Sequence, residues 1–158
     1  MEKRVKGFTL VELIVVIAII GVLAAILVPS MLGYVKNAKA REYSSNARSV
    51  FSGAQLAMVD VNNAMGDVPP NTVFTGTSDC IAHSADGSYQ FTLTDYLGDD
   101  FEGNFAFVTD NQGYGCTFAL WSPQAIPETS VVQMTEKQVK DNINSATPIG
   151  CHPMLPMS

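Results

Sequence analysis

A run of 25 residues from Phe8 to Leu32 carries one formal charge, Glu12, and constrains the fold more than any other feature of this chain. At about 1.5 Å per residue, the run is long enough to cross the hydrocarbon core of a membrane as an α-helix. A carboxylate inside a membrane costs about 3 kcal/mol near mid-span and less near an end. Because a carboxylate in an apolar environment needs a proton or a cation, Glu12 is expected to have a partner or a function.

The residues before the apolar run form a short basic segment, 1–7, with three basic side chains. A secretory signal peptide is cleaved after its apolar stretch, at small residues in an A-x-A pattern. Here the nearest such pattern, Ala38-Lys39-Ala40, lies well past the apolar run, which is also too long for a signal-peptide core. The residues therefore disfavour an ordinary secretory signal and draw attention to the junction between Gly7 and Phe8.

The segment Gly7-Phe8-Thr9-Leu10-Val11-Glu12, followed by a long apolar run with Pro29, resembles the N-terminus of type IV prepilins, and the resemblance extends to about Tyr34. It implies that a prepilin peptidase cleaves between Gly7 and Phe8 and methylates the new amino group of Phe8. It also implies that Glu12 meets the Phe8 ammonium group of a neighbouring subunit in a filament. The residues leave a second interpretation open, a single-pass anchor with an uncut leader and Glu12 at the membrane interface.

Past Leu32, apolar residues recur at helical spacing and predict an amphipathic continuation of the same helix. These positions are Tyr43, Ala47, Val50 or Phe51, Ala54, Met58 and Val61. The opposite positions are polar and include Glu42, Ser45, Arg48, Ser49, Ser52 and Gln55. The helix is expected to end near Asn62–Gly66, before the breaker Pro69-Pro70.

Gly21 and Pro29 interrupt the apolar part of the helix. Pro29 cannot donate a hydrogen bond to the Ala25 carbonyl, and Gly21 lowers the local helix propensity. A tolerated kink, common in membrane helices, explains both residues. The prepilin resemblance implies instead that the segment 21–29 unwinds or stretches within a filament, and both interpretations stay open.

The remainder of the chain reads as a small β-rich head. Residues 104–109 and 115–121 are β-rich runs on either side of a hairpin turn at 110–113. Residues 89–94 alternate like a strand, but Leu93, Tyr96 and Leu97 also suit one helical turn before Gly98. Thr135 is a candidate cap for a short helix over 136–143. Because so few residues make a marginal core, the sheet is expected to pack on the 43–61 face of the long helix.

These patterns and the resemblance together predict an α+β pilin fold, a long N-terminal helix packed against a small antiparallel sheet. We expect four segments: a leader (1–7), a transmembrane and filament-core helix (8–32), its amphipathic half (33–65) and the head (66–158).

The charges are distributed unevenly along the chain. The chain has 9 basic and 15 acidic residues. From Ser49 onward only Lys137 and Lys140 are basic, against twelve acidic residues. This balance argues against direct nucleic-acid binding by the head. A basic cluster (Lys36, Lys39, Arg41 and Arg48) precedes the acidic head and could give complementary contacts between stacked subunits.

Three cysteines, Cys80, Cys116 and Cys151, allow three single-bridge pairings or three free thiols. The prepilin resemblance favours a disulfide between Cys116 and Cys151, because many pilins tie a C-terminal loop to the sheet. The third cysteine and the wide spacing depart from the usual pilin pattern.

Nothing in the sequence points to catalysis, a cofactor or a strong metal site. Nucleophile elbow, phosphate-loop and zinc-protease motifs do not occur. The three cysteines with His152 lack metal-ligand spacing. The acids Asp99, Asp100, Glu102 and Asp110 could bind calcium, as in some secretion pseudopilins, but they lack the EF-hand pattern.

The predicted function is therefore structural: a type IV pilus subunit, made as a cytoplasmic-membrane precursor with its head outside and assembled into a surface filament. The expected partners are other copies of the chain or related pilins, the prepilin peptidase, the pilus assembly machinery and, before assembly, membrane lipid. The alternatives are a pseudopilin of a type II secretion or DNA-uptake machine and a minor pilin.

Overall fold

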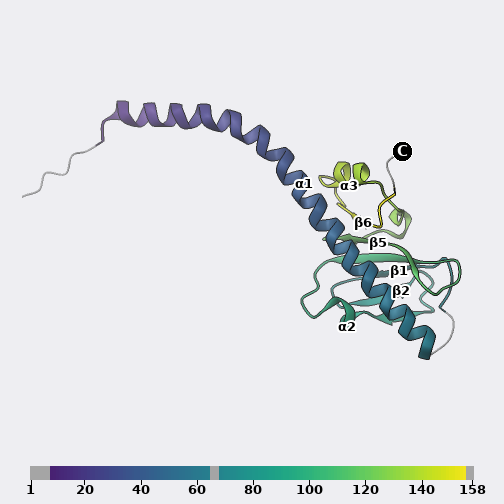
Figure 1. Cartoon of the computed structure of the whole chain (residues 1–158). Helices are drawn as coiled ribbons and strands as arrows, with labels where there is room; N and C mark the ends of the chain where they lie inside the picture. Colours follow the sequence, from purple (N-terminus) through teal and green to yellow (C-terminus); the bar gives the residue numbers. More distant parts are fainter. Residues whose placement is uncertain (1–7, 65–67, 156–158) are drawn as a thin grey trace, which may run out of the picture. The chain divides into compact units, whose positions relative to one another are not determined.

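A computed structural model describes residues 8–64 and 68–155, and its fold is α+β, as predicted (Figure 1). The chain divides into two compact units, Met1–Lys36 and Asn37–Ser158, which are considered one at a time. Helix α1, Leu10–Ala64, contributes residues to both units.

The first unit consists of the N-terminal part of α1. Its large apolar side chains are exposed on every side of the helix, from 46% exposed at Val16 to 84% at Tyr34. The helix runs without interruption through Gly21 and Pro29. Exposing a helix that is apolar on every side to water is unfavourable, so this segment requires a membrane or other helices around it.

The second unit is built on one antiparallel sheet of six strands in the order β3-β2-β1-β4-β5-β6. Its elements are β1 Val73–Gly76, β2 Ile81–Ser84, β3 Gln90–Thr92, α2 Thr94–Leu97, β4 Asn104–Thr109, β5 Cys116–Ser122, η1 Glu128–Ser130, α3 Glu136–Asn142 and β6 Gly150–His152. The β4–β5 hairpin at the centre and the helix capped by Thr135 are confirmed. The segment 89–97 forms both a short strand and a helical turn, β3 followed by α2.

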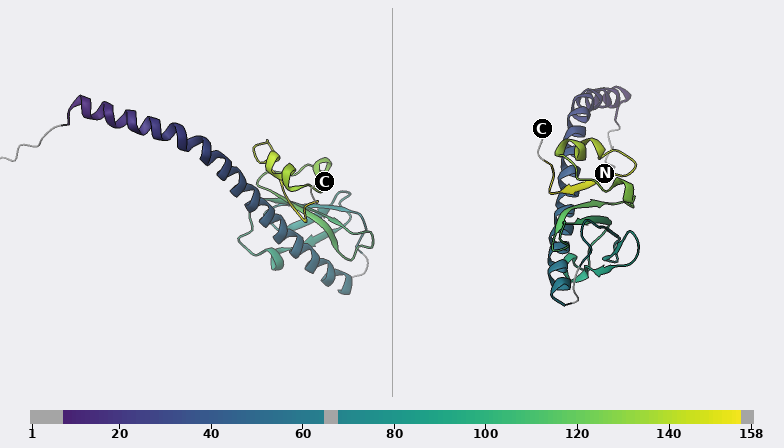
Figure 2. Two further views of the ribbon diagram at one scale, coloured as in Figure 1. Left: turned by 45° about the horizontal axis from the view of Figure 1, so that its top comes forward. Right: turned by 90° about the vertical axis from the view of Figure 1, so that its right-hand side faces the viewer.

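The C-terminal half of α1 packs on one face of the sheet, as Figure 2 shows in its right-hand view. The helix contributes small and medium side chains, and the sheet contributes aromatic ones. The buried cluster includes Ala47, Val50, Ala54, Ala57 and Met58 of α1 with Phe74, Phe105, Phe107 and Trp121 of the strands. Phe74 stacks on Phe107 with ring centroids 5.1 Å apart. The predicted packing of the 43–61 face against the sheet is confirmed.

The opposite face of the sheet carries a second buried cluster, which the sequence did not predict. Ala106, Phe118 and Leu120 alternate with the residues of the first cluster along β4 and β5. Val139 of α3, with Ile126 and Ile149 of the connecting segments, covers them. The head therefore has two packed layers on its sheet instead of one.

Two side-chain amides connect α1 to the β4–β5 hairpin. The Gln55 Nε2 group donates a 3.2 Å hydrogen bond to the Cys116 carbonyl, and Asn62 Nδ2 donates a 3.0 Å bond to the Gly113 carbonyl. Gln55, which the sequence spacing places among the polar positions of the helix, is half-buried at this junction. Its side-chain amide satisfies the Cys116 carbonyl, which would otherwise lack this hydrogen bond.

Strand β6 approaches α1 so closely that only glycine fits at its first position. A Cβ atom on Gly150 would overlap the Tyr43 carbonyl. Gly150 pairs with Trp121 of β5, and Tyr43 packs against the Trp121 ring with centroids 4.9 Å apart. This contact fixes the edge of the sheet against the helix.

The predicted disulfide between Cys116 and Cys151 is wrong. All three cysteines are buried free thiols. Cys151 pairs with Leu120 of β5. Leu120 lies four residues from Cys116 along the strand, so the backbone positions of Cys116 and Leu120 are about 13 Å apart. The two thiols also belong to different clusters, Cys116 on the helix side of the sheet and Cys151 on the other. Such a separation exceeds the reach of a disulfide.

Candidate assembly site in the first helical turn

Thr9 and Glu12 form a reciprocal cap at the start of α1. The Thr9 backbone N–H and hydroxyl group donate hydrogen bonds of 2.9 Å and 2.6 Å to Oε2 of Glu12. In return, the Glu12 backbone N–H donates a 3.3 Å bond to the Thr9 hydroxyl group. The Thr9 carbonyl accepts the first helical bond, from Leu13, at 3.3 Å. This is the capping-box arrangement, in which N-cap and N3 residues satisfy each other's backbone donors.

The capping box gives Glu12 a local partner that the sequence interpretation missed. The pattern Thr-x-x-Glu at 9–12 is the sequence signature of such a box and is sufficient to predict this contact. Both hydrogen bonds from Thr9 reach one oxygen, and an ionised carboxylate has about four acceptor sites. Glu12 can therefore cap its own helix and also accept a cation.

Of the two residues at the predicted cleavage site, one belongs to the described part of the chain. Gly7 lies outside the described residues. Phe8 is described, immediately precedes the capping box and is 82% exposed. The cap holds the Glu12 carboxylate in the first turn of α1, and Phe8 immediately precedes the capping residue Thr9.

The same helix carries the apolar surface that a membrane or filament would bury. Among the described residues, α1 is the one helix long and apolar enough to cross a membrane. Added Cβ atoms at Gly21 and Gly33 would meet nothing within 4 Å. Glycine is thus not required at either position by contacts within the chain.

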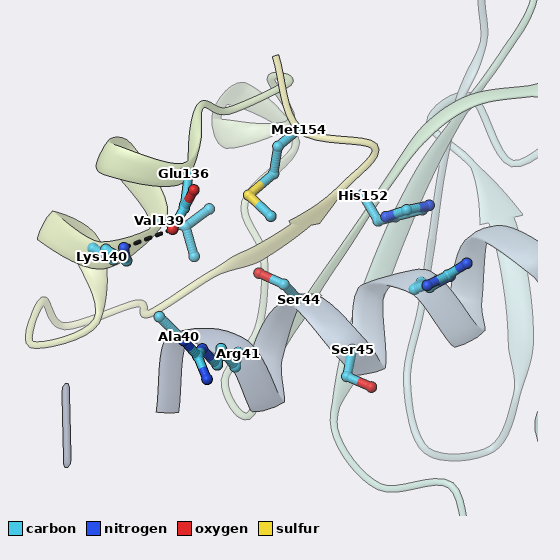
Figure 3. A pocket seen from close by; sticks show the side chains of 10 residues that line it. Ala40, Arg41, Ser44, Ser45, Glu136, Val139, Lys140, His152 and Met154 are labelled. Atoms are coloured by element: carbon cyan, nitrogen blue, oxygen red, sulfur yellow. Dashed lines mark ion pairs between the residues drawn. The ribbon is translucent and has the colours of Figure 1, made fainter. Parts of the chain in front are cut away.

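Two charged concavities flank the α1 helix in the second unit. The first, a cavity of about 280 Å³, is lined by Arg41 and Arg48 of α1 together with Glu136, Lys140 and His152 (Figure 3). Lys140 forms a 2.6 Å ion pair with Glu136. The hydrogen bond from Lys140, with a contribution from Arg41, holds the pKa of Glu136 below its usual range. Burial, helped by Arg48, lowers the pKa of His152.

The second concavity, about 520 Å³, lies on the other flank and is acidic. Its lining includes Glu42 of α1 and, from the α2–β4 connection, Asp99, Asp100 and Glu102. Within residues 8–64 and 68–155, no group of three or more His, Cys, Asp or Glu side chains is arranged to hold a metal ion. Asp110, the remaining calcium candidate, instead accepts backbone hydrogen bonds from Gln112 and Tyr114 in the β4–β5 turn.

Comparison with known proteins places these features in a family. The model of the prokaryotic N-terminal methylation motif matches residues 3–28. The chain is 40% identical over 90 residues to the fimbrial protein EcpC of Eikenella corrodens, covering 56% of this chain and 54% of the relative. It is 41% identical over 64 residues to the type II secretion system core protein G of Dickeya chrysanthemi, covering 40% of each. In these two matches the chain thus spans about half of its relative's length or less.

A further relative covers more of the chain. The type IV major fimbrial protein FimA of Dichelobacter nodosus is 31% identical over 111 residues, which is 66% of this chain and 70% of FimA. No solved structure gave a significant match. The methylation motif, the exposed apolar helix and the antiparallel sheet packed on its amphipathic half agree with this similarity. The chain belongs to the type IV pilin family.

Proposed function

We propose that this chain is a structural subunit of a type IV pilus, processed between Gly7 and Phe8 and assembled through α1 into a surface filament. The observation that carries the proposal is the methylation motif on a helix whose apolar side chains are exposed on all sides. The similarity to fimbrial proteins supports it further. A structural role accounts for these features without a catalytic one.

The exposed apolar surface of α1 supplies the cohesion of the filament. Removing one large aliphatic side chain from water is worth about 1.5–3 kcal/mol. The segment from Phe8 to Val35 exposes many such side chains, so bundling these helices outweighs any single ion pair. The precursor resides in the cytoplasmic membrane, with segment 8–32 as its span and the head outside. The mature subunit is part of the extracellular filament.

Glu12 then sets the register of the bundled helices. Cleavage after Gly7 would remove three basic residues and create an amino group on Phe8. Once the basic leader is removed, that ammonium group on a neighbouring copy is the cation available to pair with the Glu12 carboxylate. A misplaced Glu12 would stay unpaired in an apolar bundle, which disfavours wrong registers. Segment 21–29 provides local helix flexibility during assembly.

The proposal names its partners by role. They are other copies of this chain or related pilins, a prepilin peptidase that cuts the 1–7 leader, the pilus assembly machinery, and membrane lipid before assembly. Segment 33–65 supports the head, 66–158, on the outside of the bundle. No cofactor or nucleic acid takes part.

Mass spectrometry of material sheared from intact cells tests the proposal. An abundant N-terminal peptide that begins with methylated Phe8 is the expected result. A peptide that begins at Met1 would overturn it, because an uncut leader means an ordinary membrane anchor.

The second candidate function is a pseudopilin of a secretion machine. The 41% identity to a type II secretion system core protein favours it specifically. A pseudopilin would have the same processed terminus, but the processed chain would remain in the membrane fraction after shearing. Fractionation before the mass measurement therefore separates the two functions.

A further inference from the structure

The basic cavity described above concentrates positive charge in an acidic protein. It holds three of the chain's nine basic residues, Arg41, Arg48 and Lys140, against the single acid Glu136. Both arginines are exposed, and Lys140 is 39% exposed. In Figure 3, Arg41 reaches the cavity from α1, whereas Lys140 and Glu136 reach it from α3. The guanidinium groups are suited to planar carboxylate partners.

The acidic concavity has the opposite character. Its four carboxylates, on Glu42, Asp99, Asp100 and Glu102, are all exposed. No basic residue belongs to its lining. Three of these acids belong to the connection between α2 and β4, and their side chains are exposed.

The two surfaces lie on separate flanks of one helix. Arg41 and Arg48 are seven residues apart and share a face with Ser44 and Ser45 in the basic cavity. Glu42 lies on a different face, with Asn46 and Ser49. At about 100° per residue, the two faces are centred roughly 115° apart on the exposed side of the helix, and the buried residues Ala47 and Val50 lie on the remaining side. A single copy therefore cannot bring its own two surfaces together.

A second copy of the chain is the occupant whose charges fit. It carries an exposed acidic loop whose charge is opposite to that of the basic cavity, and a basic cavity whose charge is opposite to that of its neighbour's loop. A two-fold symmetric contact through either surface alone would place that surface against itself, which like charges oppose. A heterologous contact pairs basic with acidic surfaces and leaves one of each unoccupied at the two ends, so copies add in one direction.

We propose that the basic cavity of one subunit binds the acidic Asp99–Glu102 loop of the next. Successive globular heads then make the same heterologous contact along the filament. This inference rests on the proposed pilus function and adds the contact that orients successive heads. Exposed ion pairs contribute little cohesion individually. Their role here is to select the orientation of an incoming subunit, while the apolar helices hold it.

Charge reversal in full-length chains tests the contact. One variant combines Arg41→Glu with Arg48→Glu, and the other combines Asp99→Lys, Asp100→Lys and Glu102→Lys. Each is expected to lower the yield of sheared filament by about tenfold, because like charges then face each other. Combining both sets of changes restores opposite signs and is expected to recover most of the yield. Matched controls are Lys137→Glu and Glu128→Lys, exposed reversals outside both linings, which should leave the yield unchanged.

A second measurement uses the unaltered chain and avoids misfolded variants. Filaments assembled from a mixture of ¹⁴N- and ¹⁵N-labelled copies are treated with a zero-length carbodiimide, which joins an amine to a contacting carboxylate. Mixed-isotope peptides that join Lys140 to Asp99, Asp100 or Glu102 are expected. A cross-link within one copy, such as one between Lys140 and Glu136, joins peptides of the same isotope and is therefore not counted as a contact between copies.

The outcomes distinguish this contact from the pilus function itself. Wild-type yield from both reversed variants, or cross-links that join other residues, would overturn this heterologous contact while leaving the filament intact. Loss of yield in the basic variant alone, without recovery in the combined variant, would mean that another anion occupies the cavity, and would also overturn it. A wild-type chain that forms no filament would remove the basis of both proposals.

Discussion

The Thr9 hydroxyl group donates a 2.6 Å hydrogen bond to the Glu12 carboxylate, so the one charged side chain of the apolar segment caps its own helix. The carboxylate is thereby held at the first turn before any neighbouring subunit arrives. Two roles then coincide in one residue, a local cap and a charge available for a cation, and substitutions can separate them.

Glu12→Gln separates the two roles. Glutamine at N3 preserves the capping box, because its amide oxygen accepts the same bonds from Thr9, but it removes the charge. We expect normal leader cleavage and a lowered filament yield, and the same for Glu12→Ala, which removes both the cap and the charge. Immunoblots of cell extracts report processing, and sheared filament reports yield. Wild-type yield from Glu12→Gln would assign Glu12 to capping alone.

Gly7→Val is expected to block processing. A branched side chain would crowd the bond between Gly7 and Phe8 where the peptidase must approach. The precursor would keep its leader and migrate more slowly on a gel, and the N-terminal mass would remain that of the uncut chain. Val5→Ala, within the same leader, serves as the control and should be cut normally. A Gly7→Val chain of mature length would contradict the proposed cleavage site.

Gly21→Ala tests whether local unwinding assists assembly. The added Cβ meets no neighbour, and alanine stabilises a helix by about 1 kcal/mol relative to glycine. In detergent micelles we expect slower amide exchange around position 21. If segment 21–29 must unwind, filament yield falls in Gly21→Ala but not in the equally unhindered Gly33→Ala. Equal yields from both variants would leave Gly21 with no role in assembly.

Gly150→Ala is expected to destabilise the head. Its methyl group would overlap the Tyr43 carbonyl, forcing β6 away from α1. Overpacking of this kind costs about 1–3 kcal/mol. The thermal unfolding midpoint of the full chain in micelles should fall by several degrees, whereas Ser52→Ala, at an exposed helix position, should leave it unchanged. An unaltered midpoint in Gly150→Ala would show that β6 does not pack as described.

The three thiols give a chemical test of the sheet arrangement. Without reductant, iodoacetamide should add three groups to the unfolded chain and almost none to the folded chain. Burial raises the pKa of Cys116 to about 12, so little thiolate forms in the folded chain at pH 8. A single added group after unfolding would mean that two cysteines form a disulfide.

The same pKa gives a sign for alkaline stability. A thiol whose folded pKa lies above its unfolded value of about 8.5 stabilises the fold fully below pH 8.5. That contribution decreases as the pH rises toward 12, because the unfolded chain loses the proton first. Cys116→Ser or Cys116→Ala should flatten the decrease in unfolding free energy between these pH values.

The parts of the fold that the sequence predicted depend on local patterns. The long helix follows from spacing along 43–61, the β4–β5 hairpin from its turn, and the short helix from Thr135. The sequence did not predict β1, β2 or β6. These strands have only three or four residues, too few for alternation to be visible, and β1 pairs with β4 across a long sequence separation.

The site shows the same division between local and distant relationships. Thr9 and Glu12 are three residues apart, so the capping box could have been predicted. The two charged concavities could not. Each combines helix residues with residues from a distant part of the head, such as Arg48 with Lys140 or Glu42 with Asp100. The error at Cys116 and Cys151 has the same origin, since only the strand pairing shows that they lie on opposite faces of the sheet.

The strands at the two edges of the sheet, Gln90–Thr92 and Gly150–His152, have three residues each. An edge this short offers few unpaired backbone groups on which another strand could add. In the proposed filament, the heads can therefore lie close together without pairing edge to edge into an amyloid-like ribbon. Growth of such a filament would then depend on the apolar helices and not on the addition of strands to the sheets.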